Sequence, residues 1–363
     1  MIKKGNILIA TGGTGGHIFP AYSLANHFIK NSYNVQLTTD SRGLNFLKDY
    51  KNLNIKKIPS SPLIKKNILE FFFSVTIIIF SIFRSLLFLL FNRPSIIFGM
   101  GGYSSFPICI SAKILKIKFV IYENNLVIGK ANKYLLPYAE KIFVSYKELE
   151  GIPEKYDNKI FEIGNLVREE IINSKKNLNN EFDNIKILVL GGSQAAKVFA
   201  DKLPKIFKKL KNSEIPIKIY QQCLVEQNIQ LVEFYKNTKI DCEIFNFTNK
   251  IIDYYTKANL VITRSGASVL GELINVKIPF ISIPLPTSAD NHQFKNATFY
   301  KNKGYGCLIE EEDINNQLYA LIKSIFKDKI IIKNFLENQS QYSDKDIYKK
   351  INILLEKIIN EKN

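Results

Sequence analysis

The residues best suited to chemistry in this sequence form two glycine-rich turns, each directly after a short apolar segment. The first turn covers 12–17 and follows 6–10, and the second covers 191–194 and follows 187–190. A strand that ends in glycines and leads into a helix presents backbone N–H groups and a helix N-terminus, which bind phosphates and other anions. Two such turns predict two Rossmann-like halves that hold a ligand in a cleft between them.

His17 is the titratable group of the first turn, and it stands at the predicted start of a helix with Pro20 just inside it. The positive end of a helix keeps an imidazole neutral near pH 7. His17 is therefore a candidate general base or a hydrogen-bond donor to a phosphate. The alternative is a histidine that only caps the turn.

The first turn partly matches the dinucleotide fingerprint G-x-G-x-x-G, in which Asp40 would be the ribose-binding acid. The spacing fails, because counting from Gly13 places Ile18 at the third glycine position, and no G-x-x-x-x-G-K-[ST] loop occurs in the sequence. An NAD-dependent oxidoreductase is therefore the weaker hypothesis. A basic scaffold without enzyme activity would leave the paired turns without a purpose.

Length and hydropathy patterning favour two compact α/β domains, since 363 residues with 46% hydrophobic content can fill two cores. Short apolar strands alternate with helical patterns, which is typical of doubly wound parallel sheets. The predicted strands are 6–10, 35–39, 96–98, 119–122 and 141–144, then 186–190, 218–221, 242–245, 260–263 and 280–283. The polar segment 155–184 is predicted to link the domains, and a last helix over 344–360 needs a partner surface, for which the first domain is the candidate.

The net charge and the cysteines bear on the binding partners and the cellular location of the protein. A net charge of +17 suits a phosphorylated substrate, an anionic membrane or a nucleic acid, although a general lysine excess also explains it. The four cysteines are scattered without a C-x-x-C pair, so neither a disulfide framework nor a zinc site is expected. Together with an N-terminus that lacks a signal-peptide pattern, this favours a cytoplasmic protein.

Six motifs, in this order along the chain, resemble the MurG family of glycosyltransferase family 28. They are 12–20, 99–105, 122–125, 164–168, 191–194 and 264–267. That family transfers N-acetylglucosamine from UDP-N-acetylglucosamine to the C4 hydroxyl of the muramoyl sugar of undecaprenyl-pyrophosphoryl-N-acetylmuramoyl-pentapeptide (lipid I), which gives lipid II for peptidoglycan. The resemblance implies an inverting transfer, and no cofactor is expected. No metal is expected either, because the sequence has no convincing Asp-x-Asp site and helix-end amides with Arg168 can stabilise UDP.

The resemblance also implies a GT-B fold, in which two Rossmann-like domains face each other across a cleft. Residues 1–165 would bind the acceptor and the membrane, residues 166–342 would bind the UDP-sugar, and the helix within 343–363 would pack back on the first domain. The expected location is peripheral, on the cytoplasmic face of the cell (inner) membrane. A closer rival is a GT-B transferase acting on another lipid, such as diacylglycerol.

The implied reaction needs a base, and His17 and Glu123 are the candidate catalytic residues. His17 is favoured as the base, because an imidazole titrates near working pH whereas a carboxylate would need burial; the alternative for Glu123 is an orienting or helix-capping carboxylate. Donor contacts are implied for a larger set: Thr14, Gly15, Gly16, Asn125, Arg168, Ser193, Thr248, Ala267, Ser268, Val269, Leu270, Gly271, Glu272 and Gln293.

Three of these residues also have a clear chemical role of their own. Glu272 lies about a turn and a half into a predicted helix, where its carboxylate can accept both hydroxyls of a ribose. Arg168 supplies a fixed cation toward the nucleotide sugar, and the amide of Gln293 can bond sugar hydroxyls.

A few positions depart from the family pattern. Tyr122 and Asn124 stand where the family has His and Gln, and His292 stands where it has Gln. Leu166 replaces a usual proline, and Ala195 replaces a glycine of the second turn. These departures bear on the fine geometry of the site.

Residues 71–91 form an apolar run long enough to span a bilayer. Arg84 interrupts the run, and the strands on both sides of it must belong to one sheet, so we predict a helix partly packed on the sheet and partly dipped into the membrane interface. The alternative is a buried crossover helix. The expected partners are then an anionic membrane surface, polyprenyl-linked lipid I and other cell-wall synthesis proteins, and no nucleic acid.

Overall fold

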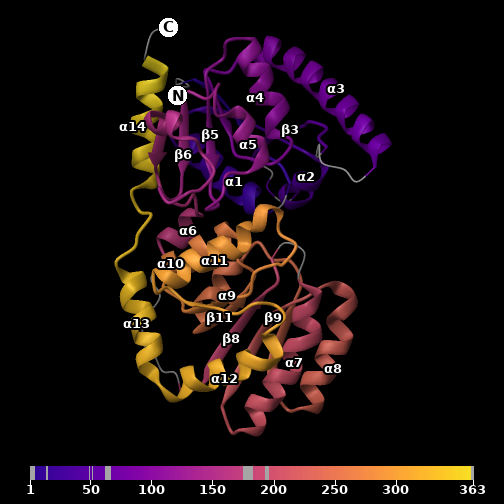
Figure 1. Ribbon diagram of the computed structural model, residues 1–363, viewed down its shortest axis with the longest axis vertical. Helices are drawn as coiled ribbons and strands as arrows, with labels where there is room; N and C mark the ends of the chain where they lie inside the picture. Colours follow the sequence, from indigo (N-terminus) through magenta and orange to yellow (C-terminus); the bar gives the residue numbers. More distant parts are fainter. Residues whose placement is uncertain are drawn as a thin grey trace. The chain divides into compact units, whose positions relative to one another are not determined.

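The computed structural model describes residues 5–13, 15–48, 50, 52–61, 67–174, 183–192 and 196–360. The chain forms two compact units, Met1–Arg168 with Asp344–Asn363, and Glu169–Ser343. Both units are α/β, with a parallel sheet flanked by helices (Figure 1). The predicted domain boundaries after residues 165 and 342 lie slightly before the boundaries of these units.

The first unit contains a seven-stranded parallel sheet in the order β3-β2-β1-β4-β5-β6-β7. Its strands are β1 (Asn6–Ala10), β2 (Asn34–Thr39), β3 (Asn54–Lys57), β4 (Ile96–Gly99), β5 (Phe119–Glu123), β6 (Lys141–Val144) and β7 (Ile160–Glu162). The central strands are buried on both faces and therefore read as continuous apolar runs. The strand order reverses between β1 and β4, where open α/β sheets bind ligands.

The second unit repeats this winding in a six-stranded parallel sheet, β10-β9-β8-β11-β12-β13. Its strands are β8 (Ile185–Leu190), β9 (Ile217–Gln222), β10 (Asp241–Phe245), β11 (Leu260–Thr263), β12 (Phe280–Ser282) and β13 (Cys307–Leu308). The order reverses between β8 and β11, so the second predicted turn also lies at a switch point.

Helices cover the sheets of both units. In the first unit they are α1 (Gly15–Lys30), α2 (Ser41–Leu47), α3 (Ile68–Asn92), α4 (Ser105–Ile114), α5 (Lys130–Leu135), η1 (Glu154–Lys159) and α14 (Ile347–Asn360). In the second they are α6 (Glu169–Ile172), α7 (Lys197–Asn212), η2 (Val225–Gln227), α8 (Asn228–Asn237), α9 (Ile251–Lys257), α10 (Ala267–Val276), η3 (Ala289–Asn291), α11 (His292–Asn302), α12 (Ile314–Lys327) and α13 (Lys329–Ser340). Each unit has a buried aliphatic core of its own.

All ten predicted strands are present, whereas β3, β7 and β13 were not predicted. These three are edge strands with two to four residues and incomplete burial, so they lack an apolar run. Because β7 pairs with β6, the prediction of a linker over 155–184 is wrong for its first part. Residues 175–182 of that segment lie outside the described part of the chain.

The last helix, α14, returns to the first unit, beside which it lies in yellow in Figure 1. Its Tyr348 ring stacks on His27 of α1, with ring centroids 4.4 Å apart. Near its end, the carbonyl oxygen of Ile358 accepts a hydrogen bond of 3.0 Å from Lys118. The chain thus closes the first unit with a segment that follows the whole second unit.

Candidate active site

Two glycine turns interlock at the switch point of the first sheet, after β1 and β4. A Cβ added to Gly102 would lie 2.8 Å from the carbonyl carbon of Gly12, and one added to Gly12 would lie 2.9 Å from Cβ of Ser104. A Cβ on Gly101 would lie 3.0 Å from the His17 ring. Gly101 and Gly102 also have φ values of +80° and +77°, which favour glycine. Side chains are therefore excluded from this turn pair by packing and by backbone conformation.

His17 lies in the first turn of α1, half-buried, with its ring beside Gly101. Its carbonyl oxygen accepts a hydrogen bond of 3.1 Å from the hydroxyl of Thr11. The structure therefore places the predicted base at the switch point, at the start of a helix. Gly15 and Gly16 form the first residues of that helix, while Thr14 lies outside the described residues.

Pro20 lies in the second turn of α1, later than predicted, because the helix already begins at Gly15. A proline has no N–H, so the carbonyl oxygen of Gly16, four residues earlier, loses its usual helical partner. The side-chain amide of Asn124, after β5, donates a hydrogen bond of 3.0 Å to that oxygen. Asn124 thus supplies the hydrogen bond that Pro20 cannot make.

Glu123 is buried at the end of β5, and both of its carboxylate oxygens already accept hydrogen bonds. Oε1 accepts from the backbone and side-chain nitrogens of Asn125, at 3.1 and 2.9 Å. Oε2 accepts from the backbone of Gly129 and the side chain of Asn132, at 2.9 and 3.0 Å. Glu123 therefore organises the loop after β5 and the start of α5, and Asn125 is held in that loop by the same carboxylate.

Asp40, the acid that an NAD-binding site would need, is also engaged. Its carboxylate caps α2 by accepting from the backbone N–H of Gly43 at 2.8 Å, and it accepts from Gly13, Arg42 and Ser60. Burial alone would raise the pKa of Asp40, but the hydrogen bonds from Gly43, Arg42 and Ser60 hold this pKa below its ordinary value. Asp40 stabilises the glycine turn and is not presented to a ribose.

Arg168 is the last residue of the first unit and is only 8% exposed. Its guanidinium lies over the ring of Phe19, 5.6 Å from the centroid, which is the geometry of a cation–π contact. Phe19 belongs to the same helix as His17. A buried cation is thus held beside the helix that carries the candidate base.

The second unit presents the N-terminus of α10 directly after β11. Gly266 is the N-cap residue and makes no side-chain cap, and the N–H groups of a helix's first turn have no partner within the helix. Ala267, Ser268 and Val269 form that first turn. The side chain of Leu270, in the next turn, is buried, and its N–H donates to the carbonyl oxygen of Gly266. Gly271 is likewise buried within the helix.

Glu272 is buried on α10, where its Oε2 accepts a hydrogen bond of 2.8 Å from the hydroxyl of Tyr255. Tyr255 belongs to α9. This bond fixes the orientation of the carboxylate that is predicted to bind ribose. Thr248 lies in the loop before α9, and its hydroxyl accepts from the N–H of Lys250 at 3.0 Å.

Two glycines at the second switch point, Gly192 and Gly266, face open space. A Cβ added to Gly192 or to Gly266 would meet none of the described atoms within 4 Å. Gly192 has a φ of +79°, whereas Gly266 adopts an extended conformation that any residue can adopt. Ser193 lies outside the described residues.

Arg264, between β11 and α10, was not predicted as a site residue. Its guanidinium donates to the carbonyl oxygens of Ile283 and Pro284 and pairs with Glu311. The loop after β12 is therefore held against the end of β11. The sequence signal for such a role is an arginine placed directly after an apolar strand.

Gln293 lies in the first turn of α11, and its side-chain oxygen accepts a hydrogen bond of 3.0 Å from the N–H of Leu285. Its amide nitrogen is the group left to donate to a sugar. Among the described residues, no group of three or more His, Cys, Asp or Glu side chains could hold a metal ion.

Comparison with known proteins defines the class of this molecule. Residues 7–144 match the glycosyltransferase family 28 N-terminal domain, and residues 186–351 match the glycosyltransferase family 28 C-terminal domain. The chain therefore belongs to glycosyltransferase family 28 and is a glycosyltransferase.

Its similar relatives carry a more particular name. A protein of Pelagibacter ubique (strain HTCC1062), 37% identical over 99% of this chain and 100% of its own length, is named UDP-N-acetylglucosamine--N-acetylmuramyl-(pentapeptide) pyrophosphoryl-undecaprenol N-acetylglucosamine transferase. A protein of Rickettsia bellii (strain RML369-C) with the same name is 32% identical over 97% of this chain and 99% of its own length.

Solved structures agree on the fold. MurG of Acinetobacter baumannii superposes with a TM-score of 0.77 at 21% identity, covering 97% of this chain and 99% of its own. MnaA of S. aureus, solved with UDP, superposes with a TM-score of 0.68 at 15% identity, covering 99% and 97%. The expectation of two Rossmann-like parallel-sheet domains of the GT-B type is confirmed.

Proposed function

We propose that this protein transfers N-acetylglucosamine from UDP-N-acetylglucosamine to the C4 hydroxyl of the muramoyl sugar of lipid I, with inversion, to give lipid II. The observation that carries this proposal is the full-length similarity to relatives named for that reaction, at 37% identity for the Pelagibacter protein. The two switch-point turns supply sites of the kind that the reaction needs, one with a titratable group and one with a helix N-terminus.

The donor belongs to the second unit in this proposal. The first turn of α10 donates N–H groups to the diphosphate, which stabilises the UDP leaving group. Glu272, fixed by Tyr255, accepts the ribose hydroxyls, and Thr248 lies in the loop assigned to the uracil. The amide nitrogen of Gln293 donates to the transferred sugar, and Arg168 adds a positive charge toward the diphosphate.

The base is His17. Attack by the C4 hydroxyl on the anomeric carbon requires a group that removes the hydroxyl proton as the bond forms and UDP departs from the opposite face. Glu123 is poorly suited to this role, because four hydrogen bonds to its carboxylate occupy both oxygens. The imidazole of His17 lies in the interlocked turn, directly beside Gly101, where a larger residue would crowd the ring.

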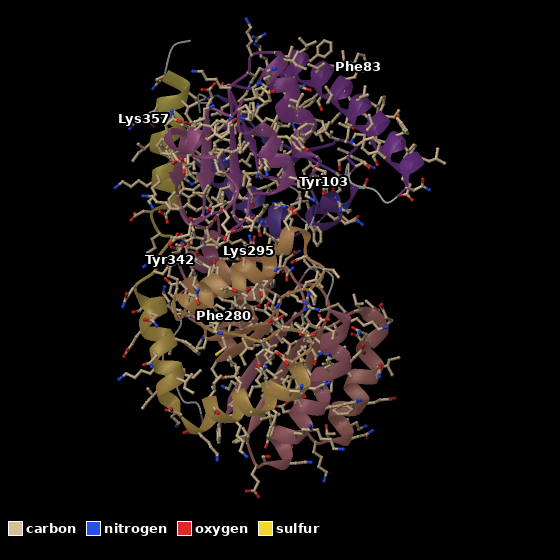
Figure 2. All side chains as sticks on the ribbon, in the orientation of Figure 1. Phe83, Tyr103, Phe280, Lys295, Tyr342 and Lys357 are labelled. Carbon is tan, nitrogen blue, oxygen red and sulfur yellow. The ribbon has the colours of Figure 1, made fainter. Side chains whose placement is uncertain are left out.

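The acceptor is presented by the membrane, to which we assign the exposed face of α3. In the described part of the chain, this is the one helix long and apolar enough to cross a bilayer, yet only 22% of its apolar window is buried. Its exposed side carries phenylalanines, among them Phe72, Phe83 and Phe91, the last 87% exposed, and Figure 2 shows Phe83 on the outer side of the helix. Such a face favours the interface of a membrane over water.

Serines occupy the inward side of the same helix, which inverts the usual amphipathic pattern. Ser81 donates to the carbonyl oxygen of Pro59 at 2.8 Å, and Ser74 accepts from the hydroxyl of Ser61 at 2.9 Å. Ser111 of α4 donates to the carbonyl oxygen of Ile82 at 3.0 Å. Because the small polar residues attach α3 to its unit, the phenylalanines remain available for lipid. We accordingly propose a peripheral location, and we assign it to the cytoplasmic face of the membrane.

The decisive experiment is transfer of labelled N-acetylglucosamine from its UDP donor to a short-chain lipid I analogue, with diacylglycerol as a competing acceptor. Transfer to the muramoyl acceptor alone supports the proposal, and transfer to diacylglycerol alone contradicts it. For the membrane assignment, the variant Phe72→Ser/Phe83→Ser/Phe91→Ser should lose sedimentation with vesicles of phosphatidylglycerol. The matched control is Ile330→Ser, an exposed apolar position on α13 of the second unit, which should sediment as the wild type does.

A further inference from the structure

The segment that ends at Arg168 is clamped by residues that lie far away in the sequence. Asp344 accepts from the backbone N–H of Asn165 at 3.0 Å and from its side-chain nitrogen at 3.4 Å. About one turn later, the hydroxyl of Tyr348 donates to the carbonyl oxygen of Val167 at 3.0 Å. Asn165 and Val167, three residues and one residue before Arg168, are thus fixed by Asp344 and by Tyr348 of α14.

Tyr122 fixes the same segment from within the sheet. Its hydroxyl accepts from the N–H of Leu166 at 3.0 Å and lies 2.9 Å from the hydroxyl of Ser145. Burial raises the pKa of Tyr122, so the hydroxyl keeps its proton and also donates to the carbonyl oxygen of Gly164 at 3.2 Å. Gly164 has a φ of +103°, so the chain turns sharply as it enters the clamp.

Arg168 follows this clamp directly and reaches the ring of Phe19 on α1. An arginine side chain has several rotatable bonds, so the direction of its guanidinium depends on how firmly its own backbone is held. A displacement of about 1 Å in a group that binds or stabilises charge is sufficient to reduce its effect strongly. The hydrogen bonds to Asn165 and Val167 therefore bear on the guanidinium itself.

We propose that Asp344 and Tyr348 are positioning residues for Arg168, through which the returning C-terminal segment sets the cation that meets the donor diphosphate. This inference rests on the donor contact proposed for Arg168 above. If α14 only completed the fold of the first unit, every contact between α14 and that unit would matter in the same way. If it positions Arg168, only the contacts to the clamped segment would affect use of the donor.

The first test is Tyr348→Phe, which keeps the ring stacked on His27 and removes only the hydroxyl. We expect the KM for UDP-N-acetylglucosamine to rise roughly fivefold, as for the loss of one neutral hydrogen bond, with the KM for lipid I unchanged. The matched control is Asn352→Ala, which removes a contact of 2.9 Å to His27 from the same helix, one turn further on. The control should leave the donor KM as in the wild type, and equal effects of both variants would overturn the inference.

The second test combines these variants with Arg168→Ala. Arg168→Ala should itself raise the donor KM, and Tyr348→Phe should then add no further rise, because the positioned group is gone. Additive effects would mean that Tyr348 acts elsewhere.

Asp344→Ala should raise the donor KM, and Asp344→Asn should restore part of the loss, since an amide oxygen can still accept from Asn165. If Arg168→Ala leaves the donor KM unchanged, both the contact and this inference fail, whereas the proposed reaction is contradicted only by the transfer assay.

Discussion

The two units place glycine turns at equivalent positions of their sheets, but the turns differ in what surrounds them. In the first unit, Gly12, Gly101 and Gly102 pack against each other, against Ser104 and against the His17 ring. In the second unit, a Cβ on Gly192 or Gly266 would meet none of the described atoms. The same residue type therefore serves close packing in one unit and leaves room in the other. In the proposed reaction, the closed turn carries the base and the open turn receives the donor.

The largest effect should come from Gly102→Ala in the closed turn. The left-handed backbone and the approach to Gly12 should together lower the free energy of unfolding by about 3 kcal/mol. Urea unfolding followed by circular dichroism measures this change. An unfolding midpoint equal to that of the wild type would show that the closed turn accepts a side chain without cost. It would then not differ from the open turn in packing.

His17→Ala tests whether the closed turn performs the chemistry. We expect kcat to fall on the order of a hundredfold or more, with the Kd for UDP unchanged, because a general base acts in the transition state. Steady-state transfer rates and calorimetric titration with UDP provide the two numbers. Glu123→Gln is the companion variant, and a larger loss of kcat there with an intact fold would transfer the role of base to Glu123.

Glu272→Gln tests the ligand side of the comparison. The amide keeps the shape and the bond from Tyr255 but loses the charge, so the Kd for UDP should rise roughly tenfold with little change in kcat. Tyr255→Phe provides the graded control, since it frees the carboxylate without removing it and should have the smaller effect. Unchanged UDP affinity in Glu272→Gln would refute the ribose contact.

The smallest effect on the fold should come from Gly266→Ala in the open turn. Its φ of −69° suits alanine, so the free energy of unfolding should stay within about 0.5 kcal/mol of the wild type. The added methyl group should nevertheless raise the Kd for UDP roughly fivefold, because it enters the space assigned to the diphosphate. The contrast with Gly102→Ala disappears if Gly266→Ala destabilises the fold and leaves UDP binding intact.

The sequence predicts the inner strands of both sheets well, because a strand buried on two faces must be an apolar run. It does not predict β3 (Asn54–Lys57) at the sheet edge, in which only Ile55 is partly buried and the other residues are exposed. The apolar run 71–91 is correctly predicted as a helix. The inward orientation of its serines is not predicted, because a serine among phenylalanines gives no sign of which side of the helix it faces. Their hydrogen bonds to Pro59 and Ser61 depend on the tertiary structure.

The site shows the same division. The placement of His17 at a helix start follows from the glycine spacing alone. The hydrogen bonding of the Glu123 carboxylate does not follow from the sequence. Its four donors come from Asn125, Gly129 and Asn132, and whether they converge depends on the conformation of the loop after β5. The same holds for the N–H groups of α10, since one residue of difference in a helix start decides whether an N–H such as that of Leu270 has a partner within the helix.

The bond between Asn124 and Gly16 makes the opening of α1 depend on a neighbouring strand. In an ordinary helix, a carbonyl oxygen at this position accepts a hydrogen bond from the backbone of the same helix. Here the carbonyl oxygen of Gly16 accepts instead from the side chain of Asn124, which follows β5. This hydrogen bond therefore couples the turn after β1 to the loop after β5. Pro20→Ala would restore a backbone N–H that can bond Gly16, so Asn124 would no longer be needed to link the turn after β1 to the loop after β5. A residue that usually weakens a helix therefore makes this link between two segments necessary.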